Sequence, residues 1–472
     1  MAILRSTLQI PKSLPRPRSP NVAMHSPRLP SVFLPPTNRS MRDLDRSFFQ
    51  KIIPIAAATV FDDRNISAVR GEIQRAGNSL GVSSLKAIVV DETVPGGRKY
   101  PKTWSPTIAE LVEKKLVGIR PYDLKLTYED WSMHNILDAT LPEFEEDDKE
   151  TPAGFSLVGH VAHLNLREQY LPYKHLIGQV LLDKNPNVRT VINKTEDVGS
   201  TNPYRTFRYE VLAGPDDMDV TVSFSGCDFR FNFAKVYWNP RLHTEHERLI
   251  SRFREGEAVC DVMAGVGPFA VPSGKKRVFV SANDLNPDSN AGLNYAIKKN
   301  KVEDFVTADC MDGREFIRRA TKELAGRDTM VIVPQRTMMP RQRQRRSKSP
   351  PWKASVRVLK APKTFQHYVM NLPASAVEFL DAFKGTYAGR SKEFTPYTET
   401  KLPMVHVYCF SEQKETEEGD RVAVCELVSK HLGHRILPST PDTEIHFVRK
   451  VSPKKCMFCA SFRLPPEIAF AE

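Results

Sequence analysis

The chain has 472 residues, enough for two to four domains that each bury a core. Its seven cysteines are scattered and odd in number, which indicates a reducing compartment. No apolar run approaches the roughly 18 residues of a membrane span, so we expect no transmembrane helix.

The formal net charge of +12 is unevenly distributed along the chain. Residues 1–42 hold seven basic residues and no acidic one, and residues 336–363 hold ten basic residues and no acidic one. The remainder is therefore slightly acidic. The high net charge alone does not indicate a nucleic-acid-binding groove.

The N-terminal third predicts three segments of different character. Residues 1–41 are rich in Pro, Ser and Arg, and we expect them to be disordered. They resemble a mitochondrial presequence, and an untargeted basic tail is the alternative. Residues 42–140 predict a small mixed domain with strands at 52–60 and 86–90. Residues 141–154 contain an acidic run that is typical of a solvated linker.

Two further domains follow. Residues 155–240 predict a second α/β unit with a helix near 173–181 and strands at 188–192 and within 220–233. The third domain is expected at 241–472. A basic insert at about 335–362, which contains RTMMPRQRQRRSKSPPWK, is too polar to pack and is expected to be disordered.

A glycine-containing loop carries the strongest signal for function. An apolar strand at 258–263 runs into residues 264–269 (AGVGPF), and a strand at 278–281 precedes Asp284. This order predicts a nucleoside-binding crevice at the carboxyl edge of a parallel sheet. Asp284 lies 17 residues after Gly267, where a carboxylate binds ribose hydroxyls in such folds.

The residue after Gly267 narrows the ligand class. Pro268 lacks the N–H group that a pyrophosphate would need, so the loop favours S-adenosylmethionine over a dinucleotide. A nicotinamide dehydrogenase is disfavoured for the same reason. The alternative is a tight turn that only packs a helix against the sheet.

Three shorter motifs each allow two interpretations. Thr244 and Glu247 form a capping-box pattern, so Glu245 is either a first-turn acid or a functional group close to the ligand. Residues 371–373 (NLP) end an apolar strand, either as a turn or as a carboxamide beside the reacting base. Residues 456–459 (CMFC) have no second cysteine pair, which favours buried thiols over zinc.

Taken together, the motifs resemble the eukaryotic and archaeal tRNA (guanine-N1-)-methyltransferases that modify guanosine 37. The resemblance covers roughly residues 42–332 and 363–472. It is carried by residues 158–166 (VGHVAHLNL), 204–208 (YRTFR), 237–241 (YWNPR), 244–246 (TEH), 264–269, 283–287 (NDLNP), 312–314 (DGR) and 371–373.

The resemblance implies a fold and a set of roles. The fold is α/β: a Rossmann-like class I methyltransferase domain preceded by two smaller N-terminal α/β RNA-binding domains. Glu245 would be the general base for guanine N1, Arg205 would lie at guanine O6, and Asn371 would help to hold the base. The implied S-adenosylmethionine site comprises His246, Gly265, Gly267, Asp284, Leu285, Asp312, Gly313 and Asn371. The implied substrate pocket comprises Tyr237, Arg241 and Pro373.

The implied function is methyl transfer from S-adenosylmethionine to N1 of guanosine 37 in cytoplasmic and mitochondrial tRNAs, which is also the first step towards wybutosine in tRNA-Phe. The implied partner is tRNA, bound at its anticodon loop and outer corner by a monomer without a metal or a membrane. The expected compartments are the mitochondrial matrix, the cytoplasm and the nucleus. The alternatives are aminocarboxypropyl transfer in wybutosine synthesis and a non-catalytic RNA-binding protein.

Overall fold

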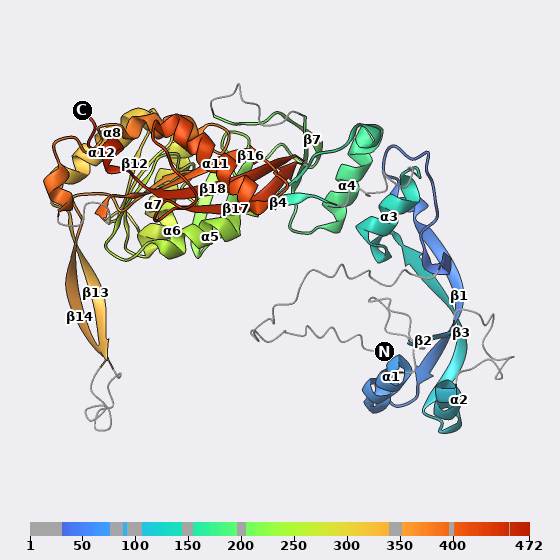
Figure 1. The fold of residues 1–472 in the computed structure, drawn as a ribbon. Coiled ribbons are helices and arrows are strands. Elements are labelled where there is room, and N and C mark those ends of the chain that lie inside the picture. Colours follow the sequence, from blue (N-terminus) through green and yellow to red (C-terminus); the bar gives the residue numbers. More distant parts are fainter. Residues whose placement is uncertain are drawn as a thin grey trace. The chain divides into compact units, whose positions relative to one another are not determined.

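The computed structural model describes residues 31–75, 88–91, 106–143, 154–195, 204–338, 352–395, 401–452 and 454–472. The chain divides into two compact units, one built mainly from Asp45–Pro142 and the other mainly from Glu143–Glu472 (Figure 1). The boundary at Pro142 falls within the segment where the sequence predicts a linker. In the described part of the chain, no helix combines the length and apolarity that crossing a membrane requires.

The N-terminal unit contains a three-stranded antiparallel sheet in the order β2-β1-β3. Its elements are β1 (Gln50–Val60), α1 (Ile66–Arg75), β2 (Ile88–Asp91), α2 (Pro106–Glu113), β3 (Val117–Thr127) and α3 (Met133–Thr140). Apolar side chains of α1 and α2, including Val69, Ile73, Ile108 and Leu111, pack against the sheet. Helix α3 is capped by Ser132, whose hydroxyl accepts a hydrogen bond from Asn135 N.

Residues 31–41 differ from the disorder that their composition predicts. Phe33 and Met41 are buried in the structure. Trp131 Nε1 donates to Phe33 O over 2.8 Å, and Asn38 N donates to Ala139 O over 2.9 Å. Burying these apolar side chains offsets the entropy lost when the segment is ordered. The rest of the expected presequence, residues 1–30, lies outside the described residues.

The second unit starts with a four-stranded sheet in the order β4-β5-β6-β7, followed by a hairpin of β8 and β9. Its elements are β4 (Ser156–Val158), β5 (Val161–Leu164), α4 (Lys174–Lys184), β6 (Thr190–Lys194), β7 (Tyr209–Ala213), β8 (Asp219–Phe224) and β9 (Cys227–Asn232). Helix α4 buries Leu176, Ile177, Val180 and Leu181, the face that the sequence predicts.

The rest of the second unit is organised around a seven-stranded sheet in the order β12-β11-β10-β15-β16-β18-β17. Its strands are β10 (Ala258–Asp261), β11 (Phe279–Asn283), β12 (Val306–Asp309), β15 (His367–Met370), β16 (Met404–Glu412), β17 (Glu444–Ser452) and β18 (Lys455–Arg463). All adjacent pairs from β12 to β16 are parallel, whereas β18 is antiparallel to both of its neighbours. The chain order reverses between β10 and β15, and ligands of open α/β sheets bind at such a switch point.

Helices cover both faces of this sheet (Figure 1). They are α5 (His243–Arg252), α6 (Ala270–Lys275), α7 (Pro287–Asn300), α8 (Gly313–Gly326), α11 (Glu417–Leu432) and α12 (Pro466–Ala469). Because side chains alternate along a strand, Val259 belongs to the core that contains side chains of α5, α6 and α7, and the adjacent Cys260 belongs to the core that contains side chains of α8 and α11. The two cores therefore lie on opposite faces of the sheet at the switch point.

A hairpin of β13 (Met330–Met338) and β14 (Trp352–Lys360) corrects part of the disorder expected at 335–362. The two strands are antiparallel and pair from Met330 with Lys360 to Met338 with Trp352. Val331 and Val333 are buried and Ile332 is exposed, so the β-branched residues follow the period of a strand. Residues 339–351 lie outside the described residues.

Candidate active site

The loop after β10 turns at two glycines whose backbones lie in the left-handed region. The φ angle is +57° at Gly265 and +94° at Gly267. A Cβ on Gly267 would lie 2.6 Å from Leu293 Cδ1 and 2.9 Å from Val271 Cγ2, whereas a Cβ on Gly265 would meet no atom within 4 Å. Gly267 therefore packs α6 and α7 closely, and Gly265 faces open space that a ligand can occupy.

Asp284 follows β11 and fixes this loop. Its Oδ2 accepts a hydrogen bond from Gly265 N over 2.8 Å, and its Oδ1 accepts one from Asn286 N over 2.9 Å. Burial raises the pKa of Asp284, although these hydrogen bonds to backbone N–H groups oppose the shift. The structure thus brings the predicted acid to the predicted glycine loop. Its contact with a ribose stays a prediction.

Asp261 ends β10 and is fully buried. Neither of its carboxylate oxygens has a hydrogen-bond partner among the described residues. Burial, and then the nearby charge of Asp284, raise the pKa of Asp261 well above its usual range. A buried polar group without a partner needs an explanation, and a ligand that supplies a donor is one.

The loops after β11 and β12 follow strands that neighbour β10 in the sheet. Asp312 caps α8, and its Oδ1 accepts hydrogen bonds from Arg314 N at 2.9 Å and Glu315 N at 3.3 Å. Gly313 is packed so closely that a Cβ would lie 3.1 Å from Phe379 and from Val262. Leu285 follows Asp284 and is exposed. These residues lie where the sequence predicts, and their contact with a cofactor stays a prediction.

The loop after β15 lies on the other side of the switch point. Val262 N donates to Val369 O over 2.9 Å, which joins the ends of β10 and β15. Asn371 Oδ1 is buried and has no partner among the described residues. Pro373 O accepts a hydrogen bond from Phe410 N over 2.9 Å, which ties the loop to β16. Residues 371–373 are thus a turn held in place, with one polar atom left for a ligand.

These features fit a nucleoside cofactor such as S-adenosylmethionine. The space beside Gly265, the carboxyl group of Asp261 and the amide oxygen of Asn371 all occur at the carboxyl ends of β10 and β15. Among the described residues, no group of three or more His, Cys, Asp or Glu side chains could hold a metal ion. Cys456 and Cys459 are buried in β18, as expected for structural thiols.

The expected capping box at Thr244 was wrong. Helix α5 begins at His243, and a 3-10 turn at Pro240–Leu242 leads directly into it. Asn239 caps this 3-10 turn, and its side chain accepts a hydrogen bond from Arg241 N over 3.0 Å, whereas the N-cap residue of α5 itself is Leu242, which makes no side-chain capping bond. Because the chain already turns at Asn239, Thr244 lies inside the first helical turn. Glu245 then points inward and is buried.

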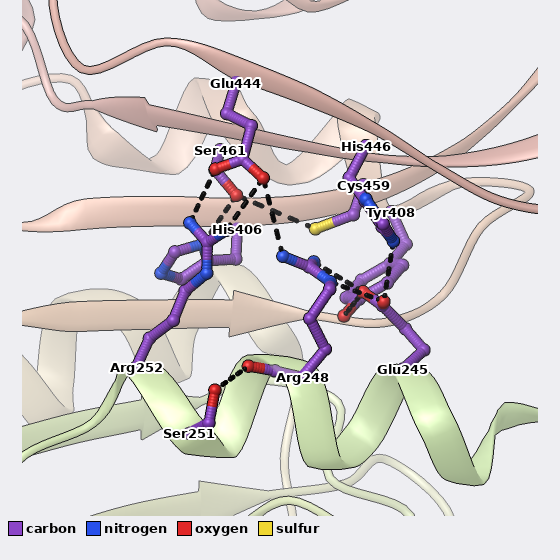
Figure 2. A network of polar contacts seen from close by, with 10 residues as sticks. All are labelled: Glu245, Arg248, Ser251, Arg252, His406, Tyr408, Glu444, His446, Cys459 and Ser461. Atoms are coloured by element: carbon purple, nitrogen blue, oxygen red, sulfur yellow. Dashed lines mark hydrogen bonds and ion pairs between the residues drawn. The ribbon is translucent and has the colours of Figure 1, made fainter. Parts of the chain in front are cut away.

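Four polar contacts converge on the Glu245 carboxylate (Figure 2). Arg248 donates from Nε to Oε2 over 2.6 Å and from Nη2 to Oε1 over 2.7 Å. Tyr408 donates from its hydroxyl to Oε1 over 2.7 Å, and His446 Nε2 lies 3.3 Å from Oε2. Burial is the largest single influence on the pKa of Arg248 and lowers it, but the hydrogen bond to Glu245 and the surrounding acidic groups together outweigh burial and raise this pKa.

The sheet register explains why these partners meet. Tyr408 on β16 pairs with Cys459 on β18, and Cys459 pairs in turn with His446 on β17. Side chains directly opposite each other point to the same face of a sheet. A single cross-strand row therefore presents Tyr408, Cys459 and His446 to α5 (Figure 2).

The predicted substrate residues occupy the loops around residues 204–208 and 237–241. Arg205 has a φ angle of +53°, an uncommon conformation for a residue other than glycine. Burial lowers the pKa of Arg205, and the neighbouring Tyr237 opposes this shift. Arg241 Nη2 donates to Ser156 Oγ over 3.4 Å. Arg205 and Asn371 are not among the described partners of Glu245, so their roles at the base stay predictions.

His246 lies on α5 next to Glu245 and is buried. Its ring centroid is 4.6 Å from that of Phe269, in an edge-to-face arrangement that places α5 beside the end of the glycine loop. Burial, and then His243, lower the pKa of His246 to about 3, so the ring is neutral at physiological pH. Its Nδ1 has no partner among the described residues.

Sequence reasoning did not find Arg248, Tyr408, His446 and Asp261. Arg248 had a usable signal, because it follows Glu245 by three positions, the spacing of neighbours on a helix. Asp261 had another, because it is the charged end of an apolar strand. Tyr408 had none, because 163 residues separate it from Glu245.

The sheet order, the reversed strand β18 and the cradle at the switch point define a class I S-adenosylmethionine-dependent methyltransferase domain. Residues 221–338 match a family model described as the TRM5/TYW2 methyltransferase domain, and residues 133–217 match the TYW2 N-terminal domain. The chain belongs to the tRNA (guanine(37)-N(1))-methyltransferase family, which makes it an S-adenosylmethionine-dependent transferase.

Curated relatives place the chain in this family. The tRNA (guanine(37)-N(1))-methyltransferase of Aspergillus fumigatus is 50% identical, over 95% of this chain and 98% of the relative. That of Emericella nidulans is 50% identical, over 94% and 96%. That of Schizosaccharomyces pombe is 47% identical, over 78% and 80%.

Solved structures share the fold at low sequence identity. Trm5b from Pyrococcus abyssi has a TM-score of 0.51 at 19% identity, over 87% of this chain and 99% of that one. The aTrm5 chain in complex with tRNALeu has a TM-score of 0.54 at 17% identity, over 87% and 100%.

Proposed function

We propose that this chain transfers the methyl group of S-adenosylmethionine to N1 of guanosine 37 in the anticodon loop of tRNA. The observation that carries the proposal is the identity of 50% to methyltransferases named for this position, over almost the whole chain. The complex of aTrm5 with tRNALeu, which shares the fold, supports tRNA as the macromolecular partner.

Methylation of guanine N1 needs a base and a group that stabilises negative charge, and we assign these roles to Glu245 and Arg205. Guanine N1 carries a proton and is a poor nucleophile at neutral pH, so a base must remove this proton as the methyl group arrives. Glu245 is the buried carboxylate on α5, beside the glycine loop. Negative charge then develops on guanine O6, where the guanidinium of Arg205 would stabilise it.

The cofactor would be held by the loops after β10, β11, β12 and β15. The residues assigned to it are His246, Gly265, Gly267, Asp284, Leu285, Asp312, Gly313 and Asn371. When bound, S-adenosylmethionine supplies a methyl group on a positively charged sulfur, which needs no metal. Tyr237, Arg241 and Pro373 would shape the pocket for the guanine.

Both N-terminal domains would contact the tRNA. The enzyme would act as a monomer. Guanosine 37 must leave its stack to reach the pocket, which costs a few kcal/mol and less in a loop than in a duplex. In tRNA-Phe this methylation would also be the first step towards wybutosine.

We place the enzyme in the mitochondrial matrix and the cytoplasm, and in the nucleus as a third compartment. The basis is the composition of residues 1–41, with Met41 as a second start site. A reporter fused to residues 1–40 should enter mitochondria. A reporter found only in the cytosol would contradict this assignment.

Methyl transfer to transcripts tests the proposed function. Purified protein with S-adenosylmethionine labelled in its methyl group should label a tRNA transcript that carries guanosine 37. A transcript that differs only in adenosine at position 37 is the matched control and should remain unlabelled. Equal labelling of both transcripts, or of neither, would reject the proposal.

A further inference from the structure

The two carboxylate oxygens of Glu245 differ in the number of close hydrogen-bond donors that they accept from. A carboxylate has two oxygens, and each offers about two lone pairs to donors. Oε1 accepts from Arg248 Nη2 and from the Tyr408 hydroxyl, each over 2.7 Å. Oε2 accepts from Arg248 Nε over 2.6 Å, and its other neighbour is His446 Nε2 at 3.3 Å. The two lone pairs of Oε1 are thus used, and Oε2 keeps one that no close donor holds.

The residues that donate to Oε1 are buried, whereas His446, which contacts Oε2, is partly exposed. Tyr408 is fully buried, and the side chain of Arg248 is only 20% exposed. His446 has a side chain that is 37% exposed and lies on β17, the edge strand of the sheet. A half-exposed contact at 3.3 Å is easier for a substrate to displace than a buried hydrogen bond at 2.7 Å.

The protonation states of the groups around the Glu245 carboxylate are consistent with this difference between its two oxygens. Burial raises the pKa of Tyr408 well above its usual range, so its hydroxyl stays a neutral donor. Burial raises the pKa of Cys459 to about 11, so this thiol stays neutral as well. Burial, and then Arg248, lower the pKa of His446, which leaves its ring neutral at physiological pH. The guanidinium of Arg248 also lies 3.7 Å from Glu444.

We propose that Oε2 of Glu245 is the atom that accepts the guanine N1 proton, and that Tyr408 and Arg248 are positioning residues that hold this oxygen ready. The inference rests on the proposed function, because it needs Glu245 to be the base. As the bond from N1 to the methyl carbon forms, the N1–H bond breaks and its proton moves to Oε2. The electron pair of the broken carbon–sulfur bond stays on sulfur.

Tyr408→Phe tests the proposal because it removes one hydroxyl and keeps the ring. Its matched control is Tyr368→Phe. Tyr368 is also fully buried, on the neighbouring strand β15, and its hydroxyl bonds to Thr321 Oγ1 at 2.7 Å and to Tyr387 at 3.0 Å. It packs in the core on the opposite face of the sheet from Tyr408. The two variants lose the same group from different sides of the sheet.

The readout is the rate of single-turnover methylation of a guanosine 37 transcript as a function of pH. Loss of one hydrogen bond to a charged group predicts a rate about tenfold lower at neutral pH for Tyr408→Phe. The acidic limb should move to higher pH, because a donor that favours the ionised form is gone. Tyr368→Phe should keep the wild-type rate within about twofold and should not move the limb.

Arg248→Lys supplies a second test that separates charge from geometry. Lysine keeps a positive charge beside Glu245 but cannot form the two-armed contact, so we expect a rate about tenfold lower although the charge is retained. Affinity for S-adenosylmethionine, measured by calorimetry on each full-length variant, should stay within about threefold of wild type.

The outcomes separate this inference from the proposed function. Tyr408→Phe and Tyr368→Phe with the same profile would overturn the positioning role, and so would a rate loss that is equal at every pH. Glu245→Gln in the same assay tests the base itself. If Glu245→Gln keeps the rate, the base assignment fails. If Glu245→Gln loses the rate and Tyr408→Phe does not, only the positioning role fails.

Discussion

Replacing Glu245 by Gln changes one charge and almost no volume. In either orientation of the new amide, its NH2 group faces donors: Arg248 Nη2 and Tyr408 on one side, Arg248 Nε and His446 on the other. Breaking a fully buried ion pair costs about 3–5 kcal/mol, and we expect about 2 kcal/mol here because Arg248 retains Glu444 as a neighbour at 3.7 Å. The loss of the proton acceptor should lower the rate about 100- to 10,000-fold.

Two measurements on the same protein separate these effects. Thermal unfolding reports the stability loss, and single-turnover methylation with excess enzyme reports the chemistry. Calorimetry should show an S-adenosylmethionine affinity within about threefold of wild type. Glu247→Gln is the matched control, because Glu247 lies on the same helix, is exposed and accepts only a 3.3 Å hydrogen bond from Ser225 Oγ among the described contacts. A Glu245→Gln rate within about threefold of wild type would show that Glu245 is not the base.

Arg205→Ala should cost about 2–4 kcal/mol in the single-turnover transition state at saturating tRNA, and a loss confined to tRNA affinity would indicate a phosphate contact instead. Asp284→Ala should raise the S-adenosylmethionine dissociation constant at least about tenfold in calorimetry, because Gly265 N loses its acceptor as well; an unchanged constant would contradict the cofactor assignment. Because burial raises the pKa of Asp261, this group favours the folded state while it is protonated, and its contribution is lost as the pH rises through the raised value. Asp261→Asn should therefore raise the Tm more at about pH 8 than at about pH 4, and an equal change at both would reject the buried-charge explanation.

Short-range sequence patterns predicted much of the expected cofactor site. The apolar run before residue 264, the two glycines and Asp284 lie within about 25 consecutive positions, and each acts through a neighbour close in sequence. The predicted strand, loop and acid therefore correspond to β10, the turn at Gly265 and Gly267, and the end of β11. The closing contact from Gly265 to Asp284 follows from the pairing of the two parallel strands.

Composition was a poorer guide where a segment carries both charge and alternation. Residues 330–338 and 352–360 form a hairpin although the region is strongly basic, because Val331 and Val333 give one face to the core. Residues 31–41 pack although they are rich in proline, because Phe33 supplies an apolar anchor. The capping box expected at Thr244 does not form, because a 3-10 turn capped by Asn239 already leads the chain into α5 before Thr244.

The environment of Glu245 shows what the sequence could not supply. Arg248 is a helical neighbour, but Tyr408 and His446 reach the carboxylate only through the register of β16, β18 and β17. That register depends on pairing between strands that the sequence does not specify locally. The sequence could indicate Glu245 as a candidate. The fold was needed to show that Oε2 has only one close donor, whereas Oε1 has two.

Mass spectrometry of anticodon-loop fragments can show whether the protein methylates guanosine 37. After incubation of a tRNA transcript with the purified protein and S-adenosylmethionine, the fragment that contains guanosine 37 should gain about 14 Da, the mass added by one methyl group. Fragmentation should place the gain on the base of nucleotide 37. A gain of about 101 Da would indicate aminocarboxypropyl transfer, and an unchanged fragment would indicate a protein that does not modify this position; either result would contradict the account.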